Sequence, residues 1–215
     1  MLAGVPLGGV ETLSDRRRNP FGMRPRCESD AFVPGYGDPS ADFHVIGDHP
    51  GRHGGAVTGV PFSDSAPGEQ LQSVLHDVGL LAAPYADMPD VTDLFLDYIH
   101  MCLPADDSDP SEASYARLER FFDAELRAVN AHILIPVGKR ATDRVLGEYT
   151  TQSHKVPADM DDRHAMEVRG RGFLVVPVKE PTVWDEGDRD RLCDRLTAIR
   201  SRDYRQTKGV ATFIG

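Results

Sequence analysis

The chain has little lysine, few aromatic residues and no long apolar run. Of its 215 residues, 34 are acidic and 24 are basic, so the formal net charge is −10. Aspartate outnumbers glutamate, arginine supplies most of the positive charge, and the only lysines are Lys139, Lys155, Lys179 and Lys208. Such a surface is typical of proteins at molar salt, where charges are screened within about 3 Å. We therefore expect a salt-adapted protein. The alternative is an ordinary acidic enzyme that never meets nucleic acid.

Cysteine is also scarce, and it occurs only at Cys27, Cys102 and Cys193. An odd, scattered set argues against a disulfide framework and favours a reducing cytoplasm. No apolar stretch is long enough to span a membrane, and the N-terminus lacks the apolar segment of a signal peptide. The sequence thus predicts a cytoplasmic protein with no membrane partner.

Apolar runs and helical spacing alternate along the chain. The runs predict four strands, at residues 43–46, 94–101, 133–137 and 173–178. Apolar residues at helical spacing and end signals predict four helices, at residues 70–78, 112–129, 141–146 and 188–200. This alternation predicts an α/β fold, a three-layer α/β/α sandwich with a four-stranded parallel sheet. We expect three segments, an irregular basic leader (1–40), one α/β domain (41–200) and a tail (201–215).

The most informative stretch is the loop after the first strand. It reads Gly47-Asp48-His49-Pro50-Gly51, and a Gly-x-Pro-Phe turn follows at residues 59–62. In open α/β sheets, ligands bind at the carboxyl ends of strands. His49 and His53 share this loop, but no third ligand for a metal is evident, so we expect solvated histidines and no metal.

This pattern resembles motif 1 of the uracil-DNA glycosylase superfamily, and in particular its family 4. There a strand leads into Gly-Glu-Ala-Pro-Gly, and a Gly-x-Pro-Phe follows. Residues 95–104, 121–138 and 177–182 resemble three further family segments in the same order. The resemblance covers about residues 27–200. It implies DNA as the partner, base flipping, and the order 2-1-3-4 for the parallel strands.

Cleavage of an N-glycosidic bond needs an activated water, negative charge near a cationic sugar and a donor to the departing base. The resemblance implies catalytic roles for Asp48, where family 4 has Glu, for His49, and for Glu180, where the family has His. A glutamate donates a proton only when it is protonated. Either Glu180 carries a proton, or His49 donates while Asp48 or Glu180 handles the water.

The resemblance also implies a base pocket and a DNA surface. Phe62 is the expected stacking platform, with Gly47 and Gly51 beside it, unless Phe62 belongs to the core. Tyr98 replaces an asparagine that reads uracil, and its single hydroxyl does not reproduce that readout. Uracil is therefore not assured as the substrate. Expected DNA contacts come from Pro50 and from the segment after the last strand, at Pro181, Thr182 and Trp184. Trp184 is either a wedge or a half-buried packing residue.

Cofactor and partner expectations follow from the same resemblance. Many family 4 enzymes hold an iron–sulfur cluster on four cysteines. Cys102 matches one ligand, but the other ligand positions fall at or near Leu118, Pro20 and Met23. One thiolate does not hold such a cluster, so we expect no iron–sulfur cluster and no cofactor. Residues 206–215 resemble a degenerate sliding-clamp peptide; a sticky terminal strand is the alternative.

Three functions stay open at this point. The first is a divergent DNA glycosylase that acts on a damaged base other than uracil, or in addition to uracil. The second is a catalytically inactive member that binds DNA or a repair partner. The third is a hydrolase of small nucleosides.

Overall fold

The computed structural model describes residues 17–104, 108–170 and 172–202, and their centre is a mixed sheet. Its order is β1-β3-β2-β4-β6-β5. The inner four strands are parallel, and they are β2 (Phe43–Gly47), β3 (Leu94–Tyr98), β4 (Ile133–Pro136) and β6 (Leu174–Val175). Read in chain order, these four strands have the expected 2-1-3-4 arrangement. The α/β class and the parallel core are confirmed.

The strand count was wrong, because the described sheet has six strands rather than four. β1 (Tyr36–Gly37) pairs antiparallel with β3, and β5 (Val168–Arg169) pairs antiparallel with β6. Each of these edge strands has only two residues. A segment that short shows no alternation of apolar and polar side chains, so no periodic signal predicts it.

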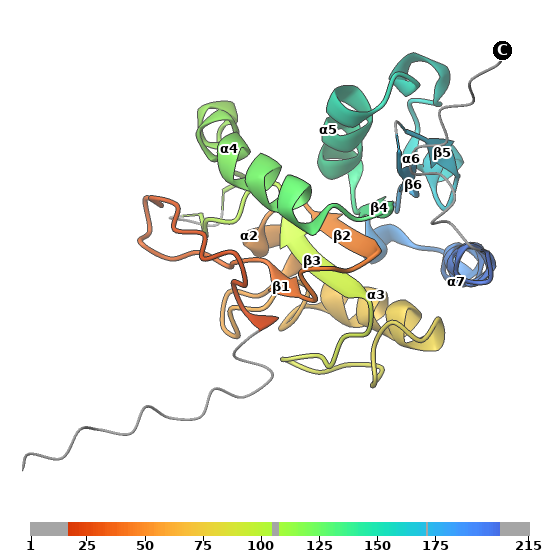
Figure 1. Cartoon of the computed structure of the whole chain (residues 1–215), viewed down its shortest axis with the longest axis horizontal. Helices are drawn as coiled ribbons and strands as arrows, with labels where there is room; N and C mark the ends of the chain where they lie inside the picture. The colour runs from red at the N-terminus through yellow and green to blue at the C-terminus, as the bar shows by residue number, and fades with distance from the viewer. Residues whose placement is uncertain (1–16, 105–107, 171, 203–215) are drawn as a thin grey trace, which may run out of the picture.

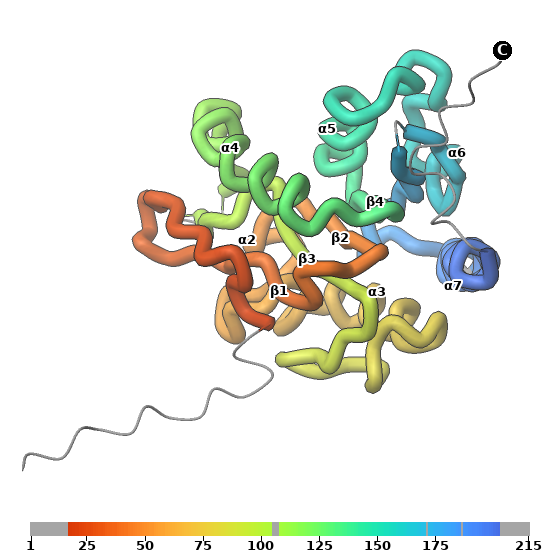
Figure 2. Tube along the Cα trace, viewed as in Figure 1, coloured from red at the N-terminus to blue at the C-terminus, as the bar shows by residue number. Residues whose placement is uncertain are grey.

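Helices cover both faces of the sheet. Figure 1 shows α4 (Glu112–Val129) and α5 (Lys139–Tyr149) on one side, and α3 (Ala66–Asp77) and α7 (Glu186–Arg200) on the other. The Cα trace in Figure 2 has the same layers. One apolar cluster joins the sheet to α3 and α7, and a second joins it to α4 and α5. The three-layer sandwich is thus confirmed.

Local signals explain where these helices begin and end. Ser111 caps α4 by accepting a hydrogen bond from the Ser114 amide, as its place before Glu112 predicted. Asn130 ends α4 in the left-handed conformation. α3 begins earlier than expected, because Ser65 caps it. The remaining short elements are α2 (Pro50–His53), η1 (Ser153–Lys155), α6 (Met160–Arg163) and η2 (Pro181–Val183).

Residues 17–40, expected to belong to an irregular leader, include β1 and contribute buried side chains such as Val33 to the core. Tyr36 is fully buried, and its hydroxyl donates a hydrogen bond of 2.9 Å to the Pro89 carbonyl. Phe21 lies against Phe95, with ring centroids 5.7 Å apart. The expected sliding-clamp peptide, by contrast, lies outside the described residues. No described helix is long and apolar enough to cross a membrane.

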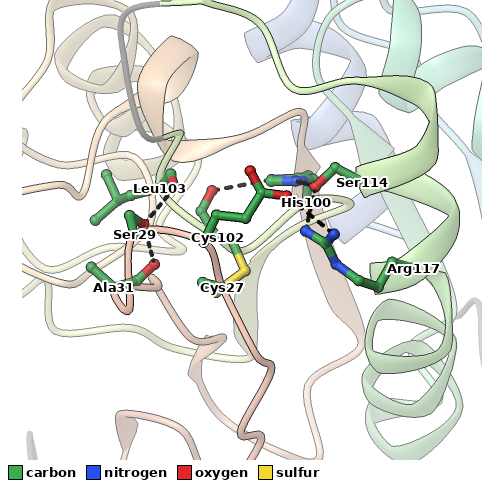
Figure 3. The surroundings of a disulfide bond; sticks show 9 residues. Cys27, Ser29, Ala31, His100, Cys102, Leu103, Ser114 and Arg117 are labelled. Carbon is green, nitrogen blue, oxygen red and sulfur yellow. Dashed lines mark hydrogen bonds and ion pairs between the residues drawn. A yellow bond between two sulfur atoms is a disulfide. The ribbon is translucent and has the colours of Figure 1, made fainter.

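The expectation that the cysteines do not pair was wrong. Cys27 and Cys102 form a disulfide that ties the N-terminal segment to the chain just after β3 (Figure 3). Next to it, the Ser29 hydroxyl donates to the Leu103 carbonyl over 2.8 Å. The two cysteines are 75 residues apart, and only the pairing of these segments brings them together. Cys193 is free.

Candidate active site

The loops after β2 and β6 open at the same edge of the sheet. β2 leads directly into Asp48 and His49, and the chain reaches Glu180 soon after β6. This is the carboxyl edge of the parallel strands, where open α/β sheets bind ligands. A cleft of about 640 Å³ lies there, and the residues that line it include Asp48, Arg52, Tyr115, Arg140 and Glu180.

Asp48 is held firmly at the wall of this cleft. One carboxylate oxygen accepts a hydrogen bond from the Tyr115 hydroxyl. The other lies 3.7 Å from Nε of Arg52 and 4.0 Å from Nε of Arg140. The Arg140 guanidinium also covers the Tyr115 ring, 4.3 Å from its centroid. Burial and the bond to Asp48 raise the pKa of the Tyr115 hydroxyl, which therefore stays a donor. Together these contacts fix the orientation of the Asp48 side chain.

Glu180 reaches the same cleft and contacts His53. Oε2 of Glu180 lies 3.1 Å from Nε2 of His53 and 3.8 Å from Nη1 of Arg52. Nδ1 of His53 accepts the backbone N–H of Asp48 over 3.0 Å. These bonds assign the His53 proton to Nε2, which donates it toward Glu180. The structure therefore brings Asp48 and Glu180 together through Arg52 and His53.

His49 points away from these two carboxylates. Its Nε2 lies 3.2 Å from Oδ1 of Asp109, and its ring faces His100. Burial lowers the pKa of the His49 imidazole. Asp109 is one of the described residues that line the cleft, and His49 is not. The expectation of solvated histidines was wrong, since His49 is 3% exposed and His53 is fully buried.

The four residues expected to bind the base differ in their surroundings. Phe62 and Tyr98 are fully buried, and a Cβ on Gly47 would lie 2.7 Å from both rings. The Tyr98 hydroxyl donates to the Gly54 carbonyl over 2.9 Å and accepts the Phe62 N–H over 2.7 Å. Gly51 is exposed at the surface of α2. In this conformation Phe62 and Tyr98 are thus packed against protein.

Replacing Tyr98 with phenylalanine should destabilise the fold by about 2 to 4 kcal/mol, because a buried carbonyl and a buried N–H both lose their partner. Chemical denaturation at molar salt measures this change. Tyr85→Phe is the matched control, since its hydroxyl also accepts a backbone N–H, that of Asp64, but the residue is 36% exposed. Equal losses in the two variants would contradict the anchoring role of Tyr98.

The residues expected to contact DNA differ in how far they are exposed. Pro50 and Pro181 are buried at the first positions of α2 and η2, and Thr182 is exposed. Trp184 is half-buried; its Nε1 donates to the Lys179 carbonyl over 2.8 Å, and its ring packs edge-on against His164. Its neighbour Val183 is an apolar side chain that is 60% exposed.

Comparison with known proteins agrees with this architecture. The family model of the uracil DNA glycosylase superfamily matches residues 34–188. The chain belongs to this superfamily. It is 29% identical over 137 residues to a type-5 uracil-DNA glycosylase of Thermus thermophilus, covering 62% of this chain and 59% of that protein. It is 22% identical over 149 residues to a type-4 uracil-DNA glycosylase of Saccharolobus solfataricus, covering 69% and 64%. The chain spans less than two thirds of the length of these two relatives.

Sequence reasoning missed three residues of this superfamily member that surround Asp48, and it expected a fourth, His53, to be solvated. The three missed residues come from α2, α4 and α5, and they are Arg52, Tyr115 and Arg140. One signal was available for Arg140, because the helix that follows a parallel strand begins at the carboxyl edge of the sheet. Tyr115 had none, since it follows Asp48 by 67 residues on a helix whose position depends on packing.

Proposed function

We propose that this protein hydrolyses the N-glycosidic bond of a damaged base in DNA, as a DNA glycosylase. The observation that supports it most is Asp48, a carboxylate fixed at the cleft by Tyr115 and flanked by two arginines. A carboxylate in this position orients the attacking water and stabilises the positive charge that develops on the sugar. The arginines exchange their acidic partners for the phosphates that flank the flipped nucleotide.

The substrate we propose is a base other than uracil, or a set that includes uracil among others. Tyr98 uses its hydroxyl to hold Gly54 and Phe62, so it has no free donor for reading a uracil edge. Glu180 accepts from His53 and is no simple replacement for a proton donor. Superfamily membership supports the reaction, and these departures support an altered specificity.

The second candidate is a non-catalytic member that binds DNA or a repair partner. One specific observation favours it. The Phe62 ring is fully buried, with His53 on one side and Tyr98 close by, so the expected stacking face is occupied by protein.

A panel of labelled duplexes separates the two candidates. Each duplex carries one modified base, chosen from uracil, hypoxanthine, xanthine and oxidised bases, and is assayed at molar salt with Asp48→Asn in parallel. Cleavage of one duplex by the wild-type chain but not by Asp48→Asn supports the glycosylase. Retained binding with no cleavage of any duplex supports the non-catalytic member and contradicts the first proposal.

We also propose that the acidic surface is an adaptation to high salt. The basic residues that line the cleft are already paired with acids, as in Lys139–Asp143, Arg140–Glu112 and Arg144–Glu119. Few counterions are then released from DNA on binding. The affinity for DNA should fall less steeply with rising salt than that of a basic glycosylase, and stability should increase with salt. Anisotropy titrations from low to molar KCl test this; a steep early loss of binding would contradict it.

We propose, further, that the protein has no iron–sulfur cluster. Cys102, which matches one ligand of the related enzymes, is bonded to Cys27. Purified protein should be colourless and contain no stoichiometric iron, which visible absorption and metal analysis measure. A broad visible band with about four irons per chain would overturn this proposal.

A further inference from the structure

The imidazole of His53 lies on the Phe62 ring in the manner of a stacked base. The two ring centroids are 5.4 Å apart and the planes differ by 24°. The Tyr98 ring lies 6.2 Å from the same imidazole, with planes at 23°. All three side chains are fully buried. An aromatic ring in near-parallel contact with another is the arrangement in which proteins hold an unpaired nucleobase.

Two hydrogen bonds hold His53 in this place, and they come from both sides of the site. Asp48 donates its backbone N–H to Nδ1 over 3.0 Å, and Nε2 lies 3.1 Å from Oε2 of Glu180. The first partner belongs to the loop after β2 and the second to the loop after β6. Only the hydrogen bond to Glu180 can be reached from the cleft, because the Glu180 side chain is 18% exposed and lines the cleft.

Gly138 lies next to both His53 and Glu180 at the wall of the cleft. Gly138 lines the cleft, and a Cβ placed on it would lie 3.1 Å from Oε2 of Glu180 and 3.8 Å from Cε1 of His53. Glycine at this position therefore leaves the space next to both side chains open. Oε1 of Glu180 is buried and has no hydrogen-bond partner among the described residues. Only Oε2 of Glu180 therefore bonds the His53 imidazole.

We propose that His53 is the gate of the base site and that Glu180 is its latch. The imidazole occupies the stacking position on Phe62, and it must rotate toward the cleft before a planar base of pyrimidine size takes its place. A closed site lowers the apparent affinity for every base by the fraction of time that the gate is open. His53 would then determine specificity. Only a base whose own contacts with the site offset the stacking and the two hydrogen bonds that His53 loses can enter. The proposal rests on the proposed glycosylase function, in which Phe62 receives the base.

The test uses the free base, so it needs neither DNA nor cleavage. His53→Gly removes the imidazole and leaves Phe62, Tyr98 and Glu180 in place. We expect this variant to bind free uracil at least about tenfold more tightly than the wild type, because two hydrogen bonds and one stacked ring no longer oppose access. Calorimetric titration measures the affinity, and thermal unfolding with and without uracil provides a second readout.

His164→Gly is the matched control. His164 is also a buried histidine with both ring nitrogens hydrogen-bonded, to the Lys179 N–H and the Asp188 carbonyl, but its ring contacts Trp184 rather than Phe62. This variant should not gain affinity for uracil. If His53→Gly does not fold, Glu180→Ala replaces it; that change releases the latch at a partly exposed side chain and should also increase the affinity.

Folded His53→Gly and Glu180→Ala that bind uracil no better than the wild type would overturn the gate. Equal gains in His53→Gly and His164→Gly would overturn it as well, because a void alone would then explain binding. A third outcome is possible, in which the wild-type protein cleaves no duplex but the His53→Gly variant binds uracil more tightly. That outcome would support the gate and contradict only the glycosylase reaction. The two proposals therefore fail separately.

Discussion

Replacing Asp48 with asparagine should lower the rate of base release by about 10²–10⁴-fold, the usual contribution of a positioned acid–base group. The substitution keeps the size of the side chain and its acceptor for Tyr115, but it removes the negative charge between Arg52 and Arg140. Affinity for DNA should change far less, because the arginines stay in place. Single-turnover cleavage of the best duplex from the panel measures the rate, and anisotropy measures binding.

Asp77→Asn is the control for this experiment. Asp77, the last residue of α3, makes an ion pair with Arg189 of α7 and does not line the cleft, so its replacement should leave the rate unchanged. His49→Ala and Glu180→Ala in the same assay test the other expected catalytic roles. Glu180 lines the cleft and His49 does not, so the larger loss should follow the change at Glu180. If the Asp48→Asn variant releases the base as fast as the wild type, the proposed catalytic role of the Asp48 carboxylate is contradicted.

Stability should fall as the pH rises above neutrality, because of a buried carboxyl pair between the sheet and α4. Asp97 of β3 and Glu125 of α4 are fully buried, next to His44 of β2. Burial raises the pKa of both carboxyls, and the proximity of Asp97 raises the pKa of Glu125 further. Burial lowers the pKa of His44 to about 3, so this imidazole is neutral in the folded protein.

The sign of this effect follows from proton binding. Above neutral pH the unfolded chain has lost both carboxyl protons, whereas the folded pair still holds a proton. The unfolding free energy then falls by about 1.4 kcal/mol per pH unit for each retained proton, until the pH passes the raised folded-state pKa. His44 contributes the opposite slope only below about pH 6.5, where the unfolded imidazole gains a proton. The range from about pH 7 to 9 therefore isolates the carboxyl pair.

Denaturant unfolding at several pH values in molar salt measures this slope. The double variant Asp97→Asn/Glu125→Gln should lose the dependence, because its amides do not titrate. The matched control is Glu148→Gln/Asp190→Asn, which changes two side chains that are 57% and 81% exposed and should retain the wild-type slope. A wild-type slope in the buried double variant would show that other groups cause the pH dependence.

The sequence by itself determined the layers and the parallel core of this protein. Apolar runs marked the four inner strands, and Ser111 marked the start of α4 through its side chain. These signals are local: a buried strand needs consecutive apolar residues, and a helix end needs a cap, whatever the rest of the chain does. The strand order and the place of Asp48 and Glu180 at one edge came from the resemblance, and the structure agrees with both.

The tertiary structure alone decided which side chains meet at that edge. Tyr115 reaches Asp48 across 67 residues, and His53 reaches Glu180 across 127. The disulfide between Cys27 and Cys102 is equally long-range. No local period encodes such contacts, because they depend on how α4 and the loops after β2 and β6 pack on the twisted sheet. His49 and His53 show the consequence: two histidines of one short loop bury their rings in different directions, one toward Asp109 and the other onto Phe62.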